Sequence, residues 1–140
     1  MTLLSTTRSK IAAAAVLAAV TASVGTAVAF ASQAGPARAP YAQAGALVEY
    51  NGALSQSKGI APVQKPSAGT YCIKFTDARL DPQKLIPTAV LGASGTTPWD
   101  ATIMVRTDPW AACGNATDTV TVFTGTSAGA QDLPFYIAIH

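Results

Sequence analysis

Short apolar or alternating runs, separated by turn residues, follow one another from Ala44 to the end of the chain. In "GTYCIKF", residues 69–75, large apolar side chains occupy every second position, which is the pattern of a half-buried strand. The runs 101–107 and 118–124 are rich in β-branched residues, which favour strands. Strands are predicted over residues 44–50, 53–57, 69–75, 85–91, 101–107, 118–124 and 134–140.

Two local signals refine this pattern. Asn51-Gly52, between the first two runs, predicts a β-hairpin with a type I′ turn, in which both central residues have positive φ. Pro87 has no N–H for a sheet ladder, so the run 85–91 is expected at a sheet edge or at a bulge.

The chain ends on an apolar run, "PFYIAIH", whose Phe135, Ile137 and Ile139 share one face of an extended chain. Such a run is unfavourable in water, so we predict an inner strand that is hydrogen-bonded on both sides. About seven short strands with Gly, Pro, Asn and Asp between them predict an all-β domain over residues 44–140. The expected architecture is a single antiparallel β-sandwich or flattened barrel.

The first 29 residues have the composition of a secretory signal peptide. Arg8 and Lys10 precede an apolar run, and the small residues of "AVA" predict cleavage after Ala29. An N-terminal anchor helix is the alternative, but the apolar run is shorter than the ~20 residues of a membrane span. We expect a signal-peptide helix over residues 1–29, only transient contact with the membrane, and a secreted protein, extracellular or at the cell surface. Residues 30–43, rich in Ala, Gly and Pro, are expected to be a flexible lead-in.

Loss of the signal peptide changes the charge balance. The full chain has nine Lys and Arg, seven Asp and Glu, and a formal charge of +2, and Arg8 and Lys10 account for the excess. The mature chain is therefore close to neutral and has no basic run, so nucleic acid is not an expected partner.

Cys72 and Cys113 are the two cysteines of the chain. An even count in an exported protein favours a disulfide, and two free thiols are the alternative. "NAT" at Asn115 has the form of a glycosylation sequon, which indicates an exposed loop after Cys113. The bridge is expected to pin this loop to the strand that holds Cys72 and to cross-link the two β layers.

Trp99 and Trp110 are the candidate interaction surface. Each follows a proline, and the two flank the predicted strand 101–107. At ~3.3 Å per residue this strand separates them by about 20 Å, so they are not expected to stack on one sugar ring. Each is either an exposed hot spot for a protein partner or a cap over the core.

No constellation of residues indicates catalysis. His140 is the single histidine and the last residue, and no G-x-S-x-G elbow accompanies it. The carboxylates stand singly in turns, and Asp77 and Asp81 lack the spacing and glycine of a calcium loop. We expect no catalytic residue, no metal site and no cofactor.

Two stretches, "GALVEYNGALSQSKGIAPVQKPSAGTYCIKF" and "TVTVFTGTSAGAQDLPFYIAIH", resemble small exported β-domain proteins of actinobacteria, of the Streptomyces type. In that group a G-x-Y-x-V-x-F strand is followed much later by a final D-x-P-F strand. The likeness covers both flanks of the mature domain and leaves residues 76–116 poorly matched. It implies an exported β-domain and no substrate, because that group has no established activity. Members often end on Cys where this chain has His140, so the bridge expected here differs from a terminal one.

These observations favour a non-catalytic exported binding or structural module. Its partner is an unknown protein, a second copy of the chain in a homo-oligomer, or the cell envelope. A secreted protease inhibitor that presents the loop 92–100 is the alternative. A small hydrolase is less favoured, because a paired nucleophile and base are missing.

Overall fold

The computed structural model describes residues 35–94 and 96–140 of the chain. The expected signal peptide, its cleavage site after Ala29 and the first part of the lead-in lie outside these residues. Within the described ranges, no helix has both the length and the apolar character needed to cross a membrane.

The described residues form ten strands and two short 3₁₀ turns. The strands are β1 (Gly35–Pro36), β2 (Ala44–Val48), β3 (Leu54–Lys58), β4 (Gln64–Ser67), β5 (Thr70–Lys74), β6 (Thr88–Leu91), β7 (Thr102–Arg106), β8 (Thr119–Thr126), β9 (Gly129–Ala130) and β10 (Phe135–Ile139). The 3₁₀ turns are η1 (Pro82–Lys84) and η2 (Ala111–Cys113).

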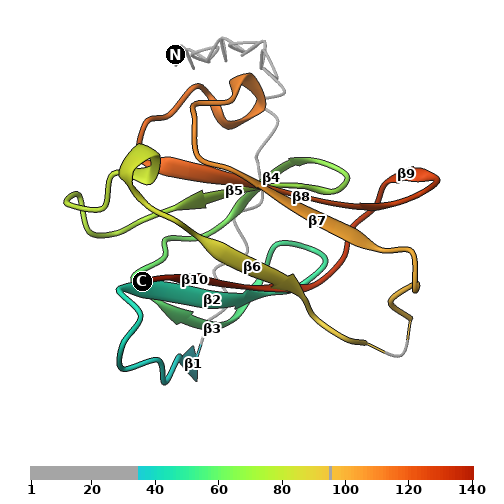
Figure 1. The fold of residues 1–140 in the computed structure, drawn as a ribbon, viewed down its shortest axis with the longest axis horizontal. Coiled ribbons are helices and arrows are strands. Elements are labelled where there is room, and N and C mark those ends of the chain that lie inside the picture. The colour runs from blue at the N-terminus through green and yellow to red at the C-terminus, as the bar shows by residue number, and fades with distance from the viewer. Residues whose placement is uncertain (1–34, 95) are drawn as a thin grey trace, which may run out of the picture.

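Two sheets pack against each other, which confirms the predicted all-β sandwich (Figure 1). The first sheet has the strand order β1-β3-β2-β10-β6. The second sheet has the order β4-β5-β8-β7, with β9 paired to β8. The pairs are antiparallel except β1 with β3, which is parallel.

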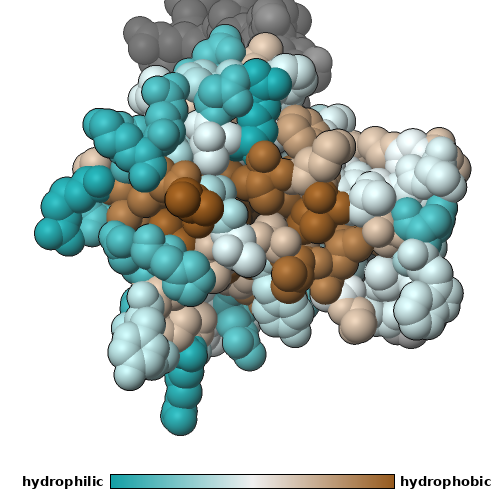
Figure 2. Space-filling model, in the orientation of Figure 1, coloured by the Kyte–Doolittle hydropathy of each residue, from teal (hydrophilic) through white to brown (hydrophobic). Residues whose placement is uncertain are grey.

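The end strands β6 and β7 of the two sheets lie side by side (Figure 1). Apolar side chains gather over this side of the molecule (Figure 2). Val90 of β6, Met104 of β7 and Ile86, just before β6, are exposed large apolar residues. This side of the sandwich is therefore apolar at its surface as well as in its interior.

The C-terminal strand β10 lies inside the first sheet, as predicted. It pairs with β2 on one side and β6 on the other, and Ile137 lies opposite Ala46 and Ala89. Phe135, Ile137 and Ile139 are buried between the sheets. Because both edges of β10 are hydrogen-bonded, its backbone polar groups have partners although the strand is buried away from water.

One aromatic pair joins the two sheets through the core. The rings of Tyr71 and Phe135 meet edge to face with their centroids 5.0 Å apart. The Tyr71 hydroxyl donates a hydrogen bond of 2.8 Å to the carbonyl of Tyr50, in the turn after β2. This bond gives the buried phenol a partner, so its burial leaves no donor unsatisfied.

The predicted hairpin between β2 and β3 is confirmed, but the predicted type I′ turn is wrong. Only Gly52 has a positive φ, of 86°, whereas a type I′ turn also needs one at Asn51. The Gly52 amide bonds to the carbonyl of Glu49, and the Asn51 side chain accepts from the amide of Ala53. The connection between β2 and β3 is longer than the two residues of a type I′ hairpin, and it is accompanied by a bulge between Leu47 and Val48.

The edge position predicted for the Pro87 run is confirmed, because β6 ends the first sheet. The strand begins only at Thr88, and η1 occupies part of the preceding segment. The sequence pattern missed β4, which contains Pro66 and reads as a loop. β4 is an edge strand with an irregular register, where a residue without an N–H is tolerated.

The described part of the lead-in differs from the flexible segment predicted over residues 30–43. β1 pairs with β3, and the Gln43 amide bonds to the carbonyl of Ile139. The Lys58 ammonium donates to the carbonyls of Ala39 and Ala42 at 3.0 and 2.6 Å. These contacts tie the segment to the first sheet although it has no apolar period.

The pH dependence of stability tests the burial of Tyr71. Burial, followed by the charge of Asp132, raises the pKa of the Tyr71 phenol from 10.0 to about 12. The fold therefore favours the neutral phenol, and this stabilisation is complete below pH 10 and is lost as the pH rises towards 12. Two pKa units correspond to at most about 3 kcal/mol of unfolding free energy.

Urea unfolding at a series of alkaline pH values should show this loss in the wild type and not in Tyr71→Phe, which has no hydroxyl to ionise. Parallel pH profiles for the two proteins would contradict the assignment.

Candidate interaction site

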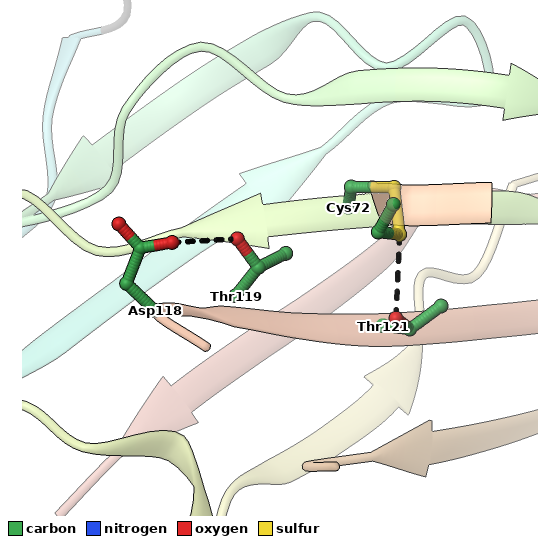
Figure 3. Close-up of a disulfide and its surroundings, with 5 residues drawn as sticks. Cys72, Asp118, Thr119 and Thr121 are labelled. Atoms are coloured by element: carbon green, nitrogen blue, oxygen red, sulfur yellow. Dashed lines mark hydrogen bonds between the residues drawn. A yellow bond between two sulfur atoms is a disulfide. The ribbon is translucent and has the colours of Figure 1, made fainter. Parts of the chain in front are cut away.

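The two cysteines form the predicted disulfide. Cys72 lies in β5 and Cys113 in η2, with their Cα atoms 5.6 Å apart. The hydroxyl of Thr121 on β8 lies 3.3 Å from the Cys113 sulfur (Figure 3). The bridge therefore holds the connection between β7 and β8 against the second sheet, as predicted for this loop.

The expectation that this bridge cross-links the two layers is wrong. Cys72 alternates along β5 with Tyr71 and Ile73, which belong to the core cluster. Its side chain therefore points to the outer face of the second sheet. The bridge joins a loop to that outer face and contributes no covalent link between the sheets.

A hollow of about 270 Å³ lies beside the bridge and is lined by both cysteines, Lys74 and Asp118 among others. Lys74 and Asp118 form an ion pair of 2.8 Å. Thr119 donates a hydrogen bond to the same carboxylate (Figure 3). The hydrogen bond from Lys74 is the largest cause that lowers the pKa of Asp118. A carboxylate held ionised and paired in this way is unsuited to act as a general acid.

Trp110 covers part of the outer face of the second sheet. The Arg106 guanidinium lies 4.5 Å from the centre of the Trp110 ring, and Phe123 meets the indole edge to face at 5.9 Å. The Trp110 side chain is 37% exposed. It is thus largely engaged within the chain, and it covers this outer face instead of the core.

Trp99 has the opposite surroundings. It is fully exposed, at 106% of the reference area. It lies in a turn closed by the hydrogen bond of 3.2 Å from the Ala101 amide to the Pro98 carbonyl. An indole in water is unfavourable, so this residue is the clearest unpartnered apolar group among the described residues.

The turn that carries Trp99 is braced from a distant segment. The Asp100 carboxylate accepts hydrogen bonds from the amide and the hydroxyl of Ser127, in the turn before β9. The hydroxyl bond is the largest cause that lowers the pKa of Asp100. No spacing in the sequence signals this contact, because the two residues are 27 positions apart.

The two tryptophans therefore do not form one surface. They flank β7, as predicted, with Trp99 before the strand and Trp110 after it. One is free and the other is packed against Arg106 and Phe123. The candidate interaction site reduces to Trp99 and its braced turn.

Each Asp and Glu side chain has a partner. Ion pairs join Asp77 to Arg79, Asp81 to Lys84, Asp108 to Arg106, Asp118 to Lys74 and Asp132 to Lys65. The other two, Glu49 and Asp100, accept from Ser55 and Ser127. The hydrogen bond from Arg79 lowers the pKa of Asp77 to about 2, and one from Lys84 lowers that of Asp81. These shifts are opposite to the raised pKa of a general acid.

The remaining candidates for chemistry stay apart. His140 is exposed at the chain end. The Ser94 hydroxyl bonds within its own loop, to Thr96 and Thr97. In the part of the chain that the structure describes, no three His, Cys, Asp or Glu residues are grouped to hold a metal ion.

Comparison with known proteins found no family model, no curated protein and no solved structure that matches the chain. The resemblance to exported actinobacterial proteins stays an interpretation of the sequence.

Removal of the bridge tests its position. The double variant Cys72→Ala/Cys113→Ala lacks the cross-link between residues 41 positions apart, so its unfolded chain has more conformational entropy. This is expected to lower the free energy of unfolding by about 4 kcal/mol. Because the bridge lies outside the core, the sheets should still form. Circular dichroism should retain the β signal, while amide exchange should accelerate chiefly between β7 and β8. A variant that is unfolded at 25 °C while the reduced wild type stays folded would contradict this position.

Proposed function

We propose that this protein is a non-catalytic exported binding module that attaches to the cell envelope through the braced turn bearing Trp99. The observation that carries the proposal is the full exposure of an indole on a turn that is closed by a backbone hydrogen bond and braced through Asp100. Tryptophan is enriched among the residues that dominate binding energies, and a rigid turn loses little entropy on binding.

The chemistry of the titratable groups supports a binding role over a catalytic one. The carboxylates are paired, and four of them, Asp77, Asp81, Asp100 and Asp118, have a lowered pKa. The hydroxyl of Ser94 and the imidazole of His140 share no hydrogen bond within the described residues. A hydrolase of this chain would need groups that these contacts already occupy.

Export is part of the proposal. It is supported by the signal-peptide pattern ending at Ala29 and by a disulfide, which persists in oxidising compartments. Identification of the first residue of the protein purified from culture medium tests this step. The expected first residue is Phe30, and recovery of the intact chain in the membrane fraction would contradict it.

Co-sedimentation with washed cell envelopes of the producing strain tests the binding role. The wild type should sediment with the envelopes at saturation, and Trp99→Ala should bind at least ~10-fold more weakly, because it loses a hot-spot aromatic. Tyr41→Ala is the matched control, since Tyr41 is also an exposed aromatic, at 92%, and lies in the lead-in segment. It should bind as the wild type does.

Three outcomes would contradict the proposal: no sedimentation of the wild type, equal binding of Trp99→Ala, or equal losses in both variants. Light scattering after size exclusion separates self-association from envelope binding. A dimer that Trp99→Ala converts to a monomer would replace the envelope with a second copy as the partner.

The protease-inhibitor alternative uses the same loop. The hydrogen bond between Asp100 and Ser127 braces this loop, which favours an inhibitor. The hydrogen bond between Ala101 and Pro98 folds the chain at Trp99, however, and a protease binds its substrate extended. Incubation with chymotrypsin, which takes aromatic residues, separates the two roles. Stoichiometric inhibition would support the inhibitor, and cleavage or no effect would remove it.

A further inference from the structure

The outer face of the first sheet carries a shallow apolar trough of about 250 Å³. Two rows of side chains cross this face, as the strand registers show. One row consists of Gln56, Leu47, Tyr136 and Val90, and the next consists of Lys58, Gly45, Ala138 and Thr88. The small residues of the second row lie beside the large residues of the first, which leaves the trough between them and the lead-in.

The lead-in forms the opposite wall. Ala37, Arg38 and Ala39 line the trough. Lys58 holds this wall in place through its two hydrogen bonds to the carbonyls of Ala39 and Ala42. These two bonds tie the wall to the first sheet at β3.

The charges around the trough have one sign. Of the seven Lys and Arg that follow the signal-peptide region, five pair with carboxylates; in the part of the chain that the structure describes, Arg38 and Lys58 do not. Arg38 lines the trough, and Lys58 ends its row of small residues. No carboxylate is among the described residues that line it.

We propose that this trough binds an acyl chain that carries an anionic group. The apolar floor of Gly45, Ala138 and Val90 takes the chain, and Arg38 takes the anion. Partial burial of the chain in an open trough contributes at most about fourfold in affinity per methylene. The guanidinium adds selectivity for an anion over a cation.

This site is independent of the Trp99 turn, since none of the residues that line the trough belongs to the loop 92–100. The failure of either proposal therefore leaves the other intact. The free acid and an anionic membrane lipid share the required chemistry, and the experiment distinguishes them.

Titration of the mature protein with decanoate, followed by ¹H–¹⁵N NMR, tests the proposal. Decanoate should bind saturably in the millimolar range or below and should shift the amides of Gly45, Leu47 and Ala138. Acetate, which lacks the chain, and decyltrimethylammonium, which lacks the anion, should bind at least ~10-fold more weakly.

Two variants examine the two halves of the site. Arg38→Gln should weaken decanoate binding ~10-fold, and it should not weaken the binding of decyltrimethylammonium, because it removes a like charge. Ala138→Leu should fill the trough and abolish binding, since its side chain points away from the core. Arg79→Gln is the matched control, because Arg79 is an exposed arginine outside the trough, and it should bind as the wild type does.

Co-sedimentation with phosphatidylglycerol and phosphatidylcholine vesicles identifies the source of the ligand. Sedimentation with the anionic vesicles alone, lost in Arg38→Gln, assigns a membrane lipid, whereas decanoate binding without sedimentation assigns a free acid. The proposal is overturned if neither ligand binds, if the cationic amphiphile binds as well as decanoate, or if the shifted amides lie on the second sheet.

Discussion

The insertion of the last strand between β2 and β6 is the constraint on which the rest of the structure depends. Without β10 the first sheet would be split, because β2 and β6 have no direct pairing with each other. β10 also supplies Phe135, Ile137 and Ile139 to the core, and Phe135 contacts Tyr71 of the opposite sheet. The two layers are therefore held together without a covalent link, mainly by buried apolar contacts, to which the hydrogen bond from the Tyr71 hydroxyl to the Tyr50 carbonyl adds.

Because the contacts between the sheets lie in the core, the outer surfaces of the sandwich are free for other roles. The bridge and Trp110 lie on the outer face of the second sheet, the trough on the outer face of the first, and Trp99 in a loop. The two cysteines, both tryptophans and the outward-facing residues of the trough, such as Gly45 and Ala138, lie outside the core cluster. Substitutions at Trp99 or at the outward-facing residues of the trough should therefore report on binding with little effect on the fold, whereas loss of the bridge lowers stability.

Most of the fold could be predicted from local pattern, because strand period, turn residues and an even cysteine count are local or compositional signals. The inner position of β10 followed from its apolar face alone. β4 was missed because Pro66 and Lys65 read as a loop, and only its pairing with β5 makes it a strand. Of the surface sites, Trp99 was predicted, but the trough depends on strand register, which brings Leu47 beside Tyr136 from 89 positions away.

Amide hydrogen exchange of the five residues of β10 tests the central packing most directly. Inner strands exchange only through global opening, so these amides should be protected as strongly as those of β5 and β8. Rapid exchange over the last strand, in protein whose other strands remain protected, would contradict the proposed architecture of the core.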